Sequence, residues 1–462
     1  MLFRSNYTAY ADYQAEFRGW SVEAGLRMDL FDAHQQVLKD PYLFYEAYTV
    51  GELGFNPDFL EKVPQSMDDH YVVYVDNENH PTRITGYRYG DQWFDEDGLN
   101  IDNPAVLDVG SGICPYLINP DQENITTSVF TGNQLYFNFL PQISVQKNFK
   151  DKVMVAFTYN SSVQDPYPEL TFSNPASYYF INNASTWVPN GSLKPERTDK
   201  LRLGISAMPL RKIVITAEGF IDYFSNMIYP VTFYGAYPKS YKSFQNEEKP
   251  FAQYGTDLAI RGISGKISGF NYGLSYHLLF NKDNPAYHLY DYLVPKSLLK
   301  GYFQFNTGFG KDYQGPAGSA NYTIFSGLGI GLFSQLQSGV YYLSSATVDG
   351  STYMDYKSDE TIPAQVFLDM KVEKGFHFND GRYHLTLYCT IRNLFDKKLI
   401  YKVYRFTGQP DDNGYLTAPE SQKQISEALD PESYRYLYAS YINNPSHYGM
   451  PRRTTLGIIF DF

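Results

Sequence analysis

The sequence predicts an all-β protein, a partial transmembrane antiparallel β-barrel. Three observations predict it. Apolar and polar residues alternate with a period of two in one segment after another, as in strands with one apolar and one polar face. The connections between these segments are alternately short and long. The last strand pattern places Leu456, Ile458, Phe460 and Phe462 on one side, which suits a wall strand facing lipid.

The composition agrees with a membrane wall made of strands. The chain has 44 Tyr, 33 Phe and 3 Trp with a negative mean hydropathy, which is what interfacial aromatic girdles would produce. No run of about 18 apolar residues predicts a membrane helix. The net charge of -12 argues against nucleic acid as a partner. Of the two cysteines, Cys114 falls in a long loop and Cys389 on the apolar face of a strand, so we expect no disulfide.

The alternation is cleanest in residues 7–17, 20–30 and 383–391, none of which has the three-and-four spacing of a helix. Counting similar segments gives about thirteen strands, each near the ~10 residues that a tilted membrane strand needs. These strands are expected to begin near residues 6, 19, 134, 151, 198, 211, 252, 269, 297, 323, 363, 381 and 451.

The connections fall into two groups that alternate along the chain. Short turns are expected at 17–19, 148–151, 208–210, 267–269 and 377–381, with a medium connector at 311–321 on the same side. Long loops are expected at 33–131, 164–196, 225–250, 283–296, 343–361 and 397–450. Outer-membrane barrels have short periplasmic turns and long external loops, whereas a soluble sandwich has no reason to sort loop length in this way. The long loops are therefore expected outside the cell.

The last long loop is expected to contain helix. Thr417 and Pro419 suit the N-cap and first-turn positions of a helix over 420–429. Asp430-Pro431 would end it, and a second helix is expected over 432–441.

Two segments resemble ligand motifs but fit them poorly. Residues 327–332 (GLGIGL) have the wrong spacing for a dinucleotide fingerprint, and no helix pattern follows; small residues facing the lumen, with Leu and Ile outward, explain them better. The acidic loop 95–102 departs from a calcium loop, because Leu99 occupies the fifth position and Gly98 the fourth. An acidic solvated turn is the preferred interpretation, so no metal or cofactor is expected.

Four short motifs carry a family resemblance: Leu193–Glu196 at the head of one strand, Ala24–Asp29 on the second, Arg392–Asp396 closing the penultimate one, and Pro451–Arg453 opening the last. In this order and spacing they resemble the C-terminal barrel of TonB-dependent outer-membrane receptors, especially those of Bacteroidota-type bacteria. The resemblance runs from about residue 7 to Phe462.

The resemblance implies a 22-stranded barrel with a plugged lumen, of which residues 1–462 would supply about thirteen strands. No counterpart of the plug domain, the TonB-interacting box, a signal peptide or the first strands is found, so we expect a C-terminal portion. Its implied partners are outer-membrane lipid, the missing N-terminal plug and strands, the TonB complex through that absent part, and the barrel assembly machinery. The terminal Phe462 resembles the assembly signal.

The function expected from the resemblance is TonB-dependent uptake of a large or scarce ligand in the cell outer membrane. The alternative is a passive porin or a structural outer-membrane protein. An enzyme is not expected, because His277 and His384 lie among strand residues without a nucleophile motif nearby. The ligand stays open among an oligosaccharide, an iron chelate, cobalamin and a peptide.

Aromatic residues of the external loops are the candidate ligand contacts, since flat rings cover apolar or sugar surfaces while offering polar edges. The candidates are Tyr89, Trp93, Tyr179 and Trp187. The alternative is that these rings pack the loops on one another or belong to the girdle. Lumen-facing Glu23, Arg27, Asp29 and Arg202 are expected to pair with each other or with a plug. The motif segments 195–196 and 393–396 are expected to shape the rim of the wall.

Overall fold

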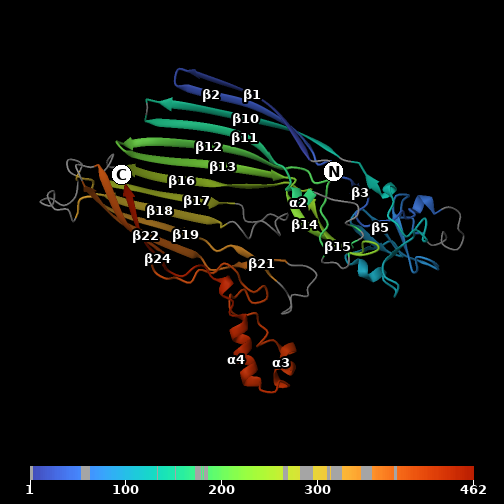
Figure 1. Cartoon of the computed structure of the whole chain (residues 1–462). Coiled ribbons are helices and arrows are strands. Elements are labelled where there is room, and N and C mark those ends of the chain that lie inside the picture. Colours follow the sequence, from blue (N-terminus) through green and yellow to red (C-terminus); the bar gives the residue numbers. More distant parts are fainter. Residues whose placement is uncertain are drawn as a thin grey trace.

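The computed structural model describes residues 4–53, 63–132, 134–150, 152–171, 178, 180–181, 186–263, 269–280, 295–309, 313, 325–344, 356–378 and 382–462. One large curved sheet dominates the molecule, and smaller elements gather at one of its ends (Figure 1).

The wall is a thirteen-stranded antiparallel sheet in which spatial order follows chain order. Its strands are β1 (Ser5–Phe17), β2 (Trp20–Asp32), β10 (Leu135–Phe149), β11 (Val153–Gln164), β12 (Glu196–Leu210), β13 (Ile213–Ser225), β16 (Phe251–Ile263), β17 (Gly269–Leu279), β18 (Ser297–Asn306), β19 (Leu328–Gln337), β22 (Gln365–Phe378), β23 (Tyr383–Arg392) and β24 (Arg453–Asp461). The predicted strand count is confirmed. The predicted starts agree too, the largest shift being from 323 to Leu328.

The register of the strands separates an apolar face from a polar one. One row of paired residues across six strands is apolar: Ala24, Ile143, Tyr159, Leu201, Ile221 and Tyr254. The neighbouring row on the opposite face is mostly polar: Gly25, Gln142, Asn160, Lys200, Asp222 and Gln253. The apolar row is open to its surroundings, with Ile143 42% and Ile221 46% exposed.

The connections at one end of the wall are short turns, except that between β18 and β19, which runs from residue 307 to 327 and is longer than the connector predicted at 311–321. Arg18 and Gly19 both have positive φ (46° and 78°), which makes the β1–β2 connection a two-residue hairpin turn of the kind that matches strand twist. Gly19 suits this position because it reaches positive φ without strain. Of the other predicted turns and connectors, residues 267–268, 283–294, 311–312, 314–321 and 379–381 lie outside the described residues.

The segment 33–131, expected to be one long loop, is folded. It contains a five-stranded sheet in the order β7-β6-β5-β4-β8 and a separate β3–β9 pair. The strands are β3 (Val37–Leu38), β4 (Val72–Val75), β5 (Ile84–Tyr89), β6 (Gln92–Asp95), β7 (Asn100–Ile101), β8 (Cys114–Pro115) and β9 (Phe130–Thr131). Other long connections contain α2 (Pro168–Thr171), the hairpin β14 (Ile228–Phe233) with β15 (Tyr241–Asn246), and the hairpin β20 (Tyr341–Ser344) with β21 (Tyr356–Thr361). Figure 1 shows β3, β5, α2, β14 and β15 at the end of the wall opposite the short turns.

The last long connection holds the two predicted helices, α3 (Pro419–Ser426) and α4 (Pro431–Ile442), which extend away from the sheet (Figure 1). The predicted N-cap was wrong: Ala418 occupies it, while the Thr417 hydroxyl donates to the Gly414 carbonyl. The first helix also ends at Ser426 rather than near 429. Asp430 caps α4 by accepting the N–H groups of Glu432 and Ser433, because its side chain can satisfy amides that have no partner in the first turn.

The outermost wall strands are β1 and β24, each with one hydrogen-bonded neighbour among the described strands. Within the described part of the chain, no helix has the length and apolar character needed to cross a membrane.

Candidate functional site

Three long connections pack on one another at the end of the wall opposite the short turns. We call residues 33–134, 165–195 and 226–250 together the loop unit. All three share one buried hydrophobic core. Its members are Leu38, Tyr42, Leu43, Phe44, Val72, Tyr74, Trp93, Leu107, Val129 and Phe130 from the first loop, Tyr178, Ile181 and Val188 from the second, and Phe233, Ala236 and Tyr241 from the third. A core drawn from segments 200 residues apart makes the loops one folded body rather than separate mobile strands of chain.

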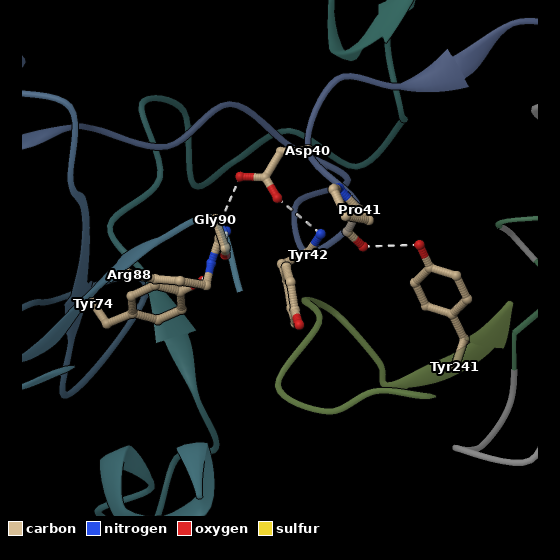
Figure 2. Close-up of polar contacts among 7 residues, drawn as sticks. All are labelled: Asp40, Pro41, Tyr42, Tyr74, Arg88, Gly90 and Tyr241. Atoms are coloured by element: carbon tan, nitrogen blue, oxygen red, sulfur yellow. Dashed lines mark hydrogen bonds and ion pairs between the residues drawn. The ribbon is translucent and has the colours of Figure 1, made fainter. Parts of the chain in front are cut away.

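A buried arginine, Arg88 on β5, is the polar centre of this body (Figure 2). Its side chain is 2% exposed, Nη2 is paired with Asp40, Nε donates to the Tyr74 hydroxyl at 3.0 Å, and Nη1 donates to the Gly90 carbonyl at 2.8 Å. The guanidinium also lies 4.6 Å from the Tyr42 ring centroid, within cation–π range. Every side of the charge is thus occupied by a partner, which a buried cation requires.

The charge state of this centre follows from its contacts. Burial alone would lower the pKa of Arg88, but Tyr74 and Asp40 raise it above its usual value, so Arg88 stays protonated. Burial raises the pKa of Tyr74, so its hydroxyl stays neutral and accepts the Arg88 N–H. The group is therefore a structural ion pair, with no ionisation change near neutral pH.

Hydrogen bonds between the loops reinforce the shared core. The Tyr241 hydroxyl donates to the Pro41 carbonyl at 2.9 Å (Figure 2), and the Tyr237 hydroxyl donates to Glu78. The second loop lies beside β15, where the Val188 N–H donates to the Lys242 carbonyl at 2.8 Å and Asn190 Nδ2 donates to the Phe244 carbonyl at 2.9 Å. These hydrogen bonds join the third loop to the first loop on one side and to the second loop on the other.

The four candidate ligand contacts fall in different surroundings. Tyr89 is 53% exposed and stacks on Tyr71 with ring centroids 5.3 Å apart. Trp187 is 50% exposed and stacks on Phe244 at 4.9 Å. Trp93 is 4% exposed and packs edge-on against Tyr42, so it is a core residue and no longer a candidate for ligand contact. Tyr179 lies outside the described residues.

A hairpin tip of the first loop is held by one carboxylate. Asp76 accepts the Thr82 and Arg83 N–H groups at 2.8 and 3.2 Å and the Thr82 hydroxyl. Partial burial raises the pKa of Asp76, but these hydrogen bonds outweigh it and hold the pKa below its ordinary value.

This lowered pKa predicts a local acid sensitivity. A carboxyl whose folded pKa is lowered stabilises the fold above its unfolded pKa, and that stabilisation is lost as the pH falls through the folded pKa. We expect hydrogen-exchange protection at Thr82 and Arg83, corrected for intrinsic rates, to weaken below about pH 4. Asp76→Asn should show the weaker protection already at neutral pH. Equal protection in both proteins at neutral pH would contradict this role.

The polar face of the wall carries ion pairs. Arg27 and Asp29 pair with each other at 2.7 Å, as expected, and Asp29 is fully buried. Arg202 pairs instead with Asp222 at 2.9 Å, and Glu23 accepts a hydrogen bond from Gln14 at 3.3 Å.

The same face carries a stack of side chains that the sequence did not indicate. Phe220 lies between Arg202, 4.7 Å from its ring centroid, and the ring of His277 at 5.2 Å, and His277 Nδ1 is 2.6 Å from Asp257. Only the register β12-β13-β16-β17 brings these residues together, so no local sequence signal could have found them.

The motif residues shape the rim of the wall, as predicted. Glu196 accepts the Ile228 N–H at 2.8 Å, at the junction with the third loop. Asn393 has a positive φ of 51° and its side chain accepts the Lys397 N–H. Asp396 accepts the Arg452 N–H at 2.7 Å, which joins two of the motifs across the rim.

The two segments that resemble ligand motifs in the sequence, 327–332 and 95–102, have structural roles. Gly329 and Gly331 lie on the polar face of β19 and pair with Glu373 and Lys371, while Ile330 and Leu332 lie on the apolar face. Asp95 accepts two N–H groups in the turn between β6 and β7. Cys114 and Cys389 are both free. In the part of the chain that the structure describes, no group of three His, Cys, Asp or Glu residues is placed to hold a metal ion.

Comparison with known proteins finds similarity to solved structures alone, since neither a protein-family model nor a curated protein matches. The chain is similar to the FrpB iron transporter from Neisseria meningitidis, F3-3 variant (TM-score 0.43, 10% identity, covering 86% of this chain and 41% of that one). It is similar to a double mutant of the Serratia marcescens hemophore receptor HasR in complex with its hemophore HasA and heme (TM-score 0.45, 14% identity, covering 86% of this chain and 49% of that one). It is also similar to the ferric-catecholate import receptor Fiu of E. coli in its closed form (TM-score 0.43, 12% identity, covering 99% of this chain and 44% of that one).

This chain thus spans less than half the length of the solved structures that it matches. Because all three TM-scores are below 0.5, any assignment has to rest on this chain's own wall, loops and motifs. By their names, these solved structures are an iron transporter, a hemophore receptor and a ferric-catecholate import receptor.

Proposed function

We propose that this chain is part of the barrel wall of a TonB-dependent receptor in the bacterial outer membrane, with the loop unit capturing a ligand outside the cell. The polar face of the wall then lines the path along which the ligand passes. The plug, the remaining strands and the coupling to TonB belong to the same proposal.

The apolar face of the wall is the observation that carries the proposal. It extends across all thirteen strands, and its side chains are open to the surroundings, from Phe139 at 49% on β10 to Leu456 at 77% on β24. Soluble monomers rarely expose apolar patches larger than a few hundred Å², whereas lipid demands such a face. The opposite face carries paired charges, which suits a water-filled or plugged interior.

The loop unit favours a receptor over a passive porin. Diffusion through a porin needs an open mouth, and mobile loops would serve it. Here three loops share a common core, and the buried Arg88 stabilises the first of them. Ordering these loops has an unfavourable conformational entropy. A fixed surface for binding a ligand gives a functional reason for that order, whereas passive diffusion does not require it.

The proposed orientation can be tested by labelling single cysteines in intact cells. In a background of Cys114→Ser and Cys389→Ser, Tyr89→Cys in the loop unit should react with a membrane-impermeant maleimide. Arg211→Cys, in the short β12–β13 turn and also exposed, is the matched control and should react only after the cells are broken.

Equal labelling of both positions in intact cells, or recovery of the protein without detergent in the soluble fraction, would contradict the proposal.

A further inference from the structure

Two cations on the polar face of the wall have no acid partner. Arg261 on β16 and Lys300 on β18 are both exposed, and neither has an ion pair or a side-chain hydrogen bond with any described residue. Other cations of this face are paired: Arg27 with Asp29, Arg202 with Asp222 and Lys371 with Glu373. The positive charges of Arg261 and Lys300 are therefore available to an anion from outside the fold.

The register of three neighbouring strands brings these two cations to one place. β17 lies between β16 and β18 (Figure 1), with Gly273 paired to Arg261 and Ser275 paired to Lys300. Since Gly273 and Ser275 are small, no bulky side chain of β17 stands between the two cations on this face. Arg261, Ser275 and Lys300 line two cavities of about 730 and 620 Å³, so they form the border that the cavities share.

The larger cavity is positively charged. Arg261 and Lys300 line it with a single acid, Asp369, which accepts the Asn393 N–H at 2.9 Å. The two acids of the smaller cavity have partners of their own: Glu218 lies 3.6 Å from Arg202, and Asp257 lies 2.6 Å from His277. A cleft lined by an excess of one charge raises the local concentration of the opposite ion, which here is an anion.

Aromatic rings line the same larger cavity. Tyr302 on β18 is 36% exposed, and its cross-strand partner Phe333 on β19 is 41% exposed; Phe367 lies beside them in the lining. The Tyr302 ring lies over Gly273, where an added Cβ would stand 2.3 Å from its Cε1. Large rings left open on a face that is otherwise polar are an informative exception, because they offer a flat apolar surface next to the two cations.

The neutral polar groups of the cavity are mostly engaged within the fold. Gln335 Nε2 donates to Gln337 Oε1 at 2.9 Å, and the Ser334 hydroxyl donates to the Gly301 carbonyl at 3.4 Å. A sugar would need a hydrogen-bond partner for each hydroxyl that it withdraws from water, and it finds few here. The lining therefore suits an anion with an apolar body better than a sugar.

We propose that this cavity binds an aromatic carboxylate. The carboxylate pairs with Arg261 and Lys300, since a guanidinium can donate to both carboxylate oxygens. The ring of the ligand lies against Tyr302 and Phe333, where aromatic rings attract one another beyond the burial of their area. The inference rests on the proposed function, in which the polar face lines the path of the ligand, and it names a ligand class for that path.

The fluorescence anisotropy of 2-naphthoate, measured with protein purified from outer membranes, tests this inference. The neutral 2-naphthamide has the same rings without the charge, and acetate has the charge without the rings. We expect 2-naphthoate to bind at least ~10-fold more tightly than 2-naphthamide, and acetate to displace it only at far higher concentrations. The preference for 2-naphthoate should shrink between about 50 and 500 mM NaCl, as salt screens the charges.

Variants assign the two parts of the ligand to their side chains. Arg261→Gln with Lys300→Gln should lower 2-naphthoate binding to the level of 2-naphthamide. Lys200→Gln with Lys397→Gln is the matched control, because it makes the same change in net charge at exposed positions outside the cavity, and it should keep the preference. Phe333→Leu should weaken both naphthyl probes alike. Heat-modifiable gel mobility checks that each variant is folded.

Three results would overturn the inference: equal binding of the two naphthyl probes, undiminished 2-naphthoate binding without Arg261 and Lys300, or an equal loss in the matched control. A protein that labels correctly in intact cells but gives one of these results refutes the ligand class alone. A protein that fails the labelling test refutes the receptor function.

Discussion

Replacing Arg88 by alanine should unfold the loop unit while leaving the wall intact. The change leaves Asp40 and the Tyr74 hydroxyl without their cation and opens a void beside Tyr42 and Trp93. Breaking a buried ion pair costs roughly 3–5 kcal/mol, and we expect the lower end, about 3 kcal/mol, because the Asp40 side chain is 29% exposed and water screens it. Hydrogen exchange should show lost protection in residues 33–131 and also at Val188 and Tyr241, since all three loops share one core.

Arg83→Ala is the matched control, because Arg83 lies on the same segment, is exposed, and contributes its backbone N–H and carbonyl to the hairpin tip at Asp76. It should leave exchange unchanged. Loss of protection confined to the first loop in Arg88→Ala would show that the three loops fold separately, which the shared core does not allow. Unchanged protection everywhere would mean that Arg88 is dispensable.

The wall could be predicted from the sequence because each of its strands carries its own signal. A two-residue period over ten or more residues leaves little freedom in where a strand lies, and a one-residue slip would turn every side chain to the wrong face. The strand start that shifted most is Leu328 on β19, beside glycines at 327, 329 and 331, which weaken the polar half of the period. Once the strands are located, antiparallel pairing of consecutive strands places their connections alternately at the two ends of the wall.

The loop unit could not be predicted because its strands are short and lack that period. Val72–Val75 is a continuous buried run, which periodicity cannot tell from a piece of buried helix. Its energetic centre joins Asp40 to Arg88, 48 residues apart, and its core joins segments that only the closed fold brings together.

The candidate contacts illustrate the same limit on sequence reasoning. Trp93 and Trp187 both lie in aromatic-rich loop segments, yet one is 4% and the other 50% exposed. The difference arises from neighbours on other loops: Tyr42 and Phe233 enclose the site of Trp93, while Trp187 covers Phe244 from the outside. An aromatic residue type indicates a large apolar surface, but only the packing of the loops decides whether a ligand can reach it.

The second large effect is expected on β10, where neighbouring residues on opposite faces allow a direct test of which face meets lipid. Ile143 lies on the apolar face and is 42% exposed, while Ser144 lies on the polar face and pairs with Glu23 of β2. An arginine near the bilayer midplane costs about 2–4 kcal/mol on the lipid face of a barrel and little in its interior. Ile143→Arg should therefore strongly reduce insertion into the outer membrane, and Ser144→Arg should be tolerated, since Glu23 stands opposite to receive the charge.

The measurement is the fraction of protein in the outer membrane that keeps the heat-modifiable gel mobility of a folded wall. Both variants add the same side chain to the same strand, so a general effect of arginine on synthesis or export would lower both equally. The reverse order, with Ser144→Arg excluded and Ile143→Arg inserted, would mean that the apolar face packs against protein and the polar face meets its surroundings. In that case the exposed rows from Ala24 to Tyr254 would be an assembly surface, and the wall would not be a lipid-facing barrel.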